Sequence, residues 1–157
     1  MERELVSESL EDTLALGARI GAAVVAGDFI ALEGPLGAGK SRLAEGIARG
    51  LGIPADERIP SPTFTIVNEH AARLLLVHAD FYRLGSPEEL DEIGWRDYEA
   101  RECVFVVEWL SRIGERAPDD RLTVELAPRG GDTRAIRLSS SGPASERLFL
   151  ALAARSD

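Results

Sequence analysis

The chain has little cysteine and no long apolar run, and each shortage excludes a class of protein. Cys103 is the only cysteine among 157 residues, so neither an internal disulfide nor a cysteine metal cluster can form. No apolar stretch approaches the roughly 20 residues that cross a bilayer. Residues 1–4 lack the pattern of a signal peptide. We therefore expect a cytoplasmic protein that makes no membrane contact.

Positive charge is also scarce, which argues against direct binding to nucleic acid. The chain carries 27 acidic and 18 basic side chains, for a net charge of −9. Affinity for nucleic acid comes largely from Lys and Arg side chains that neutralise phosphates. A local basic patch is compatible with this composition, but we expect any contact with RNA or DNA to pass through a partner protein.

What the chain does have is the composition of a single globular domain, expected over residues 1–157. Hydrophobic residues make up 45% and charged residues 29%, which is ordinary for soluble proteins and excludes a disordered chain. A chain of this length buries about 70% of its unfolded surface, so it needs no disulfide or structural metal to fold.

Hydrophobic periodicity and turn residues predict alternating helices and strands. The expected helices cover residues 7–26, 40–51, 96–101 and 143–154. The expected strands cover residues 29–32, 63–67, 74–80, 103–107, 122–126 and 134–138. Continuous apolar strands after a strand, a glycine-rich turn and a helix indicate a sheet covered on both faces. We predict a three-layer α/β fold with a mostly parallel central sheet, which would be mixed if the later strands run antiparallel.

Local signals mark the ends of several elements. Ser7 or Ser9 is expected to cap the first helix, and Gly27 is expected to end it. Ser86 is expected to cap a further helix, with Pro87 in its first turn and two glutamates after it. Residues 128–132 are expected to form a hairpin loop.

Residues 34–41, with the sequence GPLGAGKS, match the P-loop pattern G-x-x-x-x-G-K-[ST] in full. Glycines let the backbone turn sharply and bring its amides close to phosphate oxygens. The following helix N-terminus adds donors and partial positive charge. Lys40 would reach the outer phosphates, and the Ser41 hydroxyl would bind magnesium. The alternative is a turn that merely connects strand and helix, but the flanking strand and helix favour a nucleotide site. Together with the expected sheet, the motif predicts an α/β fold of the P-loop NTPase type.

Two carboxylates stand where a P-loop enzyme needs acids near its metal. Asp80 ends one apolar strand and Glu108 ends another. Ligands of open α/β sheets bind at the carboxyl ends of the strands, so we expect both side chains near the P-loop. One would hold magnesium, directly or through water, and the other would orient the attacking water or a second ligand of the metal.

Three further residues have both a functional and a packing interpretation. His78 shares a strand face with Asp80, and a neutral core histidine is favoured there. Trp109 would stack on or seal the site, with core packing equally compatible. Thr63, in the segment SPTFT of residues 61–65, lies where a γ-phosphate-sensing segment is often found, although the same residues also form ordinary turns.

The remaining motifs narrow the enzyme class. No Asn-Lys-x-Asp motif is present, which argues against a GTPase, and the length argues against helicases and transporters. One alternative is a phosphotransferase in which Arg83 and Arg96 clamp a small hydroxylated metabolite. Another is a nucleotide-gated interaction module whose partners respond to binding alone.

Several segments together resemble one family. They are residues 36–41 (LGAGKS), 61–65 (SPTFT), 78–84 (HADFYRL), 87–90 (PEEL), 94–98 (GWRDY) and 107–109 (VEW). In this order they resemble the TsaE family, the small ATPases of bacterial tRNA threonylcarbamoyladenosine biosynthesis, from about residue 9 to residue 126. The P-loop is shared by many families, whereas the segments around Asp80 and Glu108 are more particular.

The resemblance implies an activity and partners. Family members bind ATP and Mg²⁺, hydrolyse ATP slowly alone, and do so faster with the proteins TsaB and TsaD. TsaD transfers a threonylcarbamoyl group to an adenosine beside the tRNA anticodon, and ATP hydrolysis is thought to reset the complex. The acidic charge agrees with a subunit that meets tRNA only indirectly.

The resemblance also implies roles for individual residues. Phosphates would be bound by Leu36, Gly37, Ala38, Gly39, Lys40 and Ser41. Magnesium would be held by Ser41 and Glu108, while Asp80 would act near the γ-phosphate with Lys40. Trp109 and Thr63 would lie beside the nucleotide, and Thr13 and Gly131 would contact its base. The family often has threonine where this chain has Ser41, and both residues supply the metal-binding hydroxyl. It often has a small hydroxyl residue where this chain has Arg42, so the contact to the α-phosphate is less clear here.

Overall fold

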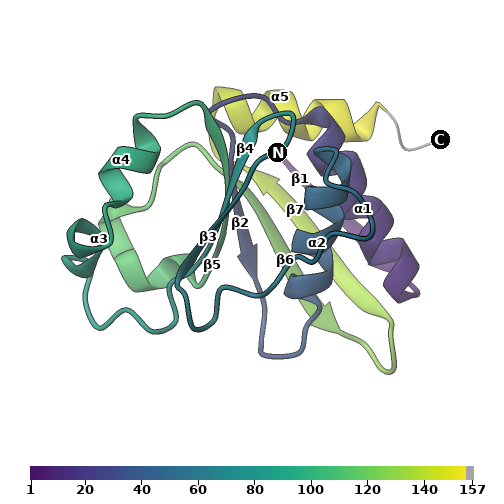
Figure 1. Cartoon of the computed structure of the whole chain (residues 1–157). Helices are drawn as coiled ribbons and strands as arrows, with labels where there is room; N and C mark the ends of the chain where they lie inside the picture. Colours follow the sequence, from purple (N-terminus) through teal and green to yellow (C-terminus); the bar gives the residue numbers. More distant parts are fainter. Residues whose placement is uncertain (155–157) are drawn as a thin grey trace.

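The computed structural model describes residues 1–154 and places a β-sheet between two layers of helices (Figure 1). Residues 155–157, the end of the domain expected from the sequence, lie outside the described residues. The strands are β1 (Glu2–Ser7), β2 (Phe29–Glu33), β3 (Val67–His70), β4 (Leu75–Asp80), β5 (Cys103–Glu108), β6 (Leu122–Pro128) and β7 (Arg134–Ser140). The helices are α1 (Leu10–Ala23), α2 (Lys40–Gly50), α3 (Glu89–Glu92), α4 (Trp95–Glu99), the 3-10 helix η1 (Leu110–Arg116) and α5 (Pro143–Ala153). None of the helices within residues 1–154 has the length and apolar character needed to cross a bilayer.

The sheet is mixed, and its parallel part lies in the centre. The strand order is β1-β7-β6-β2-β5-β4-β3. β2 pairs parallel with both β5 and β6, and β4 pairs parallel with β5. β1, β3 and β7 are added through antiparallel pairs. The predicted α/β fold is therefore confirmed, and the sheet is mixed because its outer strands pair antiparallel, an arrangement that the sequence had left open.

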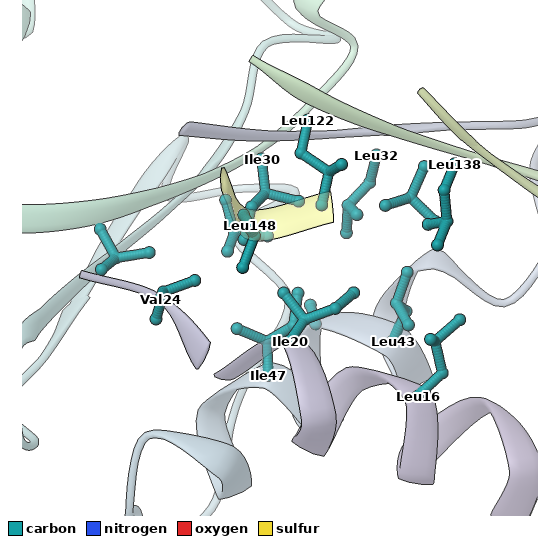
Figure 2. Close-up of a cluster of buried hydrophobic side chains, with 14 of the residues drawn as sticks. Leu16, Ile20, Val24, Ile30, Leu32, Leu43, Ile47, Leu122, Leu138 and Leu148 are labelled. Carbon is teal, nitrogen blue, oxygen red and sulfur yellow. The ribbon is translucent and has the colours of Figure 1, made fainter. Parts of the chain in front are cut away.

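One face of the sheet is covered by α1, α2 and α5. Alternate residues of a strand point to opposite faces, so every second apolar residue of the central strands enters this layer. Ile30 and Leu122 of the sheet meet Ile20 and Ile47 of the helices in one buried cluster (Figure 2). Burying such aliphatic side chains stabilises the fold by about 1.5–3 kcal/mol each, so this cluster fixes α2 against the end of β2.

The other face is covered by α3, α4 and η1, at the β2, β5 and β4 part of the sheet (Figure 1). Val77 and Phe105 of the strands pack with Leu90, Trp95 and Ile113 of these shorter helices. Because the two cores use alternate positions, His78 and Asp80 of β4 share the face of Leu76, which packs toward α2.

Helices α1 and α2 touch through their backbones. A Cβ atom added at Gly21 would lie 2.1 Å from the carbonyl oxygen of Ile47, and one added at Gly46 would lie 2.4 Å from that of Leu14. No side chain fits between the helices at these points. The glycines therefore let α1 lie directly on the P-loop helix.

We expect Gly21→Ala to destabilise the protein more than any surface substitution on α1. Overpacking a tight contact costs about 1–3 kcal/mol and occasionally more, and the 2.1 Å approach to a carbonyl leaves the methyl group no room. Urea unfolding should show a lower midpoint with an unchanged slope. Ala22→Ser, at the exposed next position, is the control and should cost about 0.5 kcal/mol. Equal midpoints for the two variants would contradict the close helix contact.

Several expected element ends are wrong, and each has a local cause. The strand expected over residues 63–67 begins only at Val67, because residues 62–66 form a turn that ends with Ile66 at a φ of 70°. Helix α3 begins at Glu89 and has no side-chain cap, so Ser86 does not cap it. Of the two serines proposed to cap α1, Ser9 does so by accepting a hydrogen bond from the Asp12 amide.

Two elements were not anticipated. Strand β1 mixes charged residues with Leu5 and Val6, and only its pairing with β7 makes it a strand. The 3-10 helix η1 begins directly after Trp109, whose φ of 58° turns the chain sharply away from β5.

Candidate nucleotide-binding site

The glycine-rich turn connects β2 to α2 at one end of the sheet. β2 is buried between β5 and β6, and α2 begins at Lys40 with Gly39 as its N-cap. Gly39 has a φ of 106°, in the left-handed region that favours glycine. The first amides of a helix have no partner within it and carry partial positive charge. The turn therefore presents amide donors where an anion can bind.

A cavity of about 520 Å³ opens beside this turn. Its lining includes the P-loop residues Leu36, Gly37, Gly39, Lys40 and Ser41. The volume falls within the range of about 300–1,000 Å³ that is usual for small-molecule sites. The residues predicted to bind phosphates, 36–41, form what we call the phosphate cradle. All of them except Ala38 thus line one cavity.

Four further predicted residues line the same cavity. Asp80 and Glu108 end their strands, Trp109 follows Glu108, and Thr63 lies in the turn before β3. Asp80 and Glu108 are register partners in the parallel pair β4–β5. Partners in register project to the same face, so the two carboxylates lie side by side on the face toward α2. The structure thus brings together the two acids that the sequence placed near the P-loop.

Glu108 is held by a buried histidine. His78 Nε2 lies 3.1 Å from Glu108 Oε2, and both side chains are almost fully buried. In the tautomer with its proton on Nε2, His78 donates this hydrogen bond. His78 was expected to be a core residue on the face of Asp80; its contact with Glu108, across the strand pair, was not anticipated.

Asp80 is buried in a setting that disfavours its charge. Burial raises the pKa of the Asp80 carboxyl, the amide of Tyr82 opposes this shift by donating to Oδ1 at 2.9 Å, and Glu108 raises the pKa further. Lys40 and His78 act in the lowering direction with smaller effect. A carboxylate with a raised pKa beside an anion site is typical of groups that act in catalysis.

Lys40 is the only lysine of the chain, and the residue is 6% exposed. Its ammonium lies 4.5 Å from the centroid of the Trp109 ring, a cation–π contact. Within residues 1–154 it forms no ion pair with a carboxylate. Trp109 itself packs on Tyr82, with ring centroids 4.9 Å apart. The site thus holds a buried cation against an aromatic face, next to the phosphate cradle.

The donor set of this cavity fits magnesium. Mg²⁺ prefers oxygen ligands and usually takes one or two carboxylates together with substrate phosphates and water. Ser41 offers a hydroxyl, and the Glu108 carboxylate is bonded to His78 through Oε2, which leaves Oε1 for a metal. Within the described chain, no group of three or more His, Cys, Asp or Glu side chains could hold a metal by itself. A metal here would therefore depend on the phosphates.

Some predicted residues lie outside the cavity lining. Thr13 is buried, and its hydroxyl lies 2.7 Å from that of Ser7, so its hydrogen-bonding capacity is used inside the fold. Ala38 is also buried, and its amide donates to the Pro35 carbonyl. Gly131 lies on the β6–β7 hairpin and does not line the cavity. Base contacts at Thr13 and Gly131 remain predictions.

Residues missed by sequence reasoning line the cavity instead. They are Leu10 at the start of α1, Tyr82 after β4 and Arg134 at the start of β7. Tyr82 was visible in the segment after Asp80, whereas Leu10 and Arg134 carry no motif and reach the cavity only through the fold. Arg83 and Arg96, the two arginines considered for an acceptor site, do not line it, and Arg83 donates to the Phe64 carbonyl.

A larger hollow, of about 650 Å³, lies elsewhere, along β1, β7 and β6 near the end of β2. Glu4, Glu33 and Glu125 line it together with Arg129 and Arg137. Its acidic side chains do not suit a phosphate ligand, and it holds no second group of buried titratable residues. The buried charged residues suited to catalysis therefore lie in the smaller cavity at the P-loop.

Known proteins are similar to this chain in sequence and in fold. A family model described as threonylcarbamoyl adenosine biosynthesis protein TsaE matches residues 7–136. The tRNA threonylcarbamoyladenosine biosynthesis protein TsaE of Treponema pallidum is 37% identical over 139 residues, spanning 85% of this chain and 98% of that protein. The TsaE protein of Bacillus subtilis is also 37% identical over 139 residues, spanning 88% and 85% of the two chains.

A solved structure agrees with these relatives. The crystal structure of Bacillus subtilis YdiB superposes with a TM-score of 0.83 at 34% sequence identity, covering 100% of this chain and 97% of that one. The P-loop type of α/β fold, predicted from residues 34–41 and the strands around them, is confirmed by this likeness.

Proposed function

The chain belongs to the TsaE family of threonylcarbamoyl adenosine biosynthesis proteins, and we propose that it serves tRNA threonylcarbamoyladenosine modification as a magnesium-dependent ATPase. We further propose that it acts with TsaB and TsaD in the cytoplasm and meets tRNA only through that complex. The net charge of −9 supports an indirect contact with tRNA.

One observation carries the ATPase proposal. The buried Lys40 ammonium, the Ser41 hydroxyl and the carboxylates of Asp80 and Glu108 all line a single cavity at the start of α2. Phosphoryl transfer requires a cation and amide donors for the phosphates, an oxygen site for Mg²⁺, and an acid that positions the nucleophile. Each requirement has a residue in this cavity.

The proposed roles follow from these positions. The amides at the start of α2 and Lys40 bind the outer phosphates and stabilise the charge that develops on them. Ser41 and Glu108 would hold Mg²⁺, which neutralises charge on the phosphate oxygens when bound. His78 keeps the Glu108 carboxylate in place through its 3.1 Å contact. Asp80, beside Glu108 on the same sheet face, orients the attacking water.

Phosphate release by the purified protein tests the proposal. We expect slow release from ATP by the protein alone, faster release when TsaB and TsaD are both added, and none when EDTA removes the metal. The partners without this chain are the control for contaminating activity. The amount of threonylcarbamoyladenosine formed on tRNA should be measured in the same reactions, so that hydrolysis can be compared with modification.

Two outcomes would contradict the proposal in different ways. Release indifferent to TsaB and TsaD would leave an ATPase without the proposed partners. Labelled γ-phosphate recovered on an added hydroxylated metabolite, rather than as inorganic phosphate, would replace hydrolysis with phosphotransfer.

A further inference from the structure

Arg134, the first residue of β7, reaches across from the β6–β7 hairpin to the P-loop. Its Nε donates to the Ala38 carbonyl at 2.8 Å, and its Nη2 lies 3.5 Å from the Gly37 carbonyl. Its Nη1 donates to the carbonyls of Gly131 and Thr133 at 2.7 and 3.0 Å. One guanidinium thus connects the P-loop to the hairpin, which lie at the same end of the molecule (Figure 1).

We propose that Arg134 is a positioning residue of the phosphate cradle, which orients the peptide groups of the P-loop for a polyphosphate ligand. This inference rests on the proposed nucleotide site and adds a residue to it that carries no motif in the sequence.

Arg134 determines the direction of one P-loop amide. In a trans peptide the N–H and the C=O point to opposite sides. Holding the Ala38 carbonyl toward Arg134 therefore directs the N–H of Gly39 away from it. The preceding amide, of Ala38, is already bonded to the Pro35 carbonyl. Arg134 thus holds the orientation of the peptide between Ala38 and Gly39, directly before Lys40.

Arg134 also affects the charge at the P-loop. A carbonyl oxygen carries partial negative charge, and a carbonyl that turned into the cradle would repel phosphate. Arg134 holds the carbonyl oxygens of Ala38 and Gly37 away from the phosphate cradle by donating hydrogen bonds to them. Within residues 1–154 its guanidinium has no ion-pair partner, and it lines the cavity. Its positive charge is therefore not neutralised by a carboxylate and also favours an anionic ligand.

The competing explanation is that Arg134 only stabilises the β6–β7 hairpin through its bonds to Gly131 and Thr133. Substitutions at Arg134 distinguish this stabilising role from a role in ligand binding. Arg134→Met keeps the length of the side chain but removes its charge and donors. We expect the dissociation constants for ATP and ADP to rise by about tenfold or more, since hydrogen bonds made by charged groups are among the strongest. Calorimetry without Mg²⁺ measures this effect independently of turnover and of the metal.

Arg134→Lys is the second variant, because it keeps the charge without the planar fork. We expect lysine to recover less than half of the lost binding free energy, and the peptide covering residues 35–41 to exchange its amide hydrogens faster in both variants. Arg137→Met is the matched control. Arg137 lies on the same strand, is exposed, and pairs with Glu4 and Glu125, so its loss should change nucleotide affinity less than twofold.

The outcomes distinguish this inference from the proposed function. If the wild-type chain binds neither ATP nor ADP, both are wrong. If the wild type binds and a folded Arg134→Met binds equally well, only the assignment of Arg134 is wrong. Full recovery of affinity and amide protection by Arg134→Lys would mean that charge alone acts, and would likewise overturn the positioning role.

Discussion

Lys40→Ala is expected to abolish most nucleotide binding, with the dissociation constant for ATP rising by about 10- to 150-fold. That range corresponds to the 1.5–3 kcal/mol typical of a hydrogen bond to a charged group. The ammonium is the chain's only lysine, is buried against Trp109, and has no carboxylate partner within the described residues. A phosphate that enters the cavity therefore meets a cation that the fold has not already neutralised.

Calorimetric titration with ATP and with ADP measures the effect. Lys40→Met, which keeps most of the side-chain packing beneath Trp109, should lose as much affinity as Lys40→Ala, because both lack the charge. Arg101→Ala is the control, since Arg101 is exposed and forms a surface ion pair with Glu69. An unchanged dissociation constant in both Lys40 variants would show that the phosphates bind elsewhere.

Asp80→Asn is expected to separate binding from turnover. Asparagine keeps the oxygen that accepts the 2.9 Å hydrogen bond from the Tyr82 amide, so the local backbone should not change. The variant loses the carboxylate that orients water, and removal of a positioned acid or base typically slows a reaction about 10²- to 10⁴-fold. ATP affinity should be kept or should increase, because a negative charge leaves the neighbourhood of the phosphates.

Phosphate release in the presence of TsaB and TsaD, alongside calorimetry, gives the two quantities. Asp97→Asn, an exposed position on α4, is the matched control. If Asp80→Asn binds ATP and restores tRNA modification without hydrolysis, the protein is a nucleotide-gated interaction module and not an ATPase. Full turnover by the variant would remove Asp80 from the chemistry.

The parts of the site that the sequence predicted are those fixed by local chemistry. The GPLGAGKS segment alone predicts the turn and the helix start, because the turn ends at Gly39 and α2 begins at the next residue, Lys40. Asp80 and Glu108 could be placed together because each ends an apolar strand, and parallel strands end at one edge of a sheet. Their direct register was not predictable, since it depends on how β4 and β5 pair.

The parts that the sequence did not predict depend on contacts between distant segments. Arg134 is one arginine among many, and only the β6–β7 hairpin brings it to Ala38, 96 residues earlier in the chain. Strand β1 forms because β7 is available to pair with it. The turn over residues 62–66 contains β-branched and aromatic residues that favour strands, but Ile66 adopts a left-handed conformation that no propensity would suggest.

The glycine contacts between α1 and α2 bear on the thermodynamics of ligand binding. Both helices contribute to the nucleotide cavity, α2 through Lys40 and Ser41 and α1 through Leu10. Because their backbones touch at Gly21 and Gly46, neither helix can shift without the other. This half of the cavity is therefore preorganised, and binding loses little conformational entropy there. We expect the entropy loss on binding to fall mainly on the exposed turn carrying Thr63, which also lines the cavity.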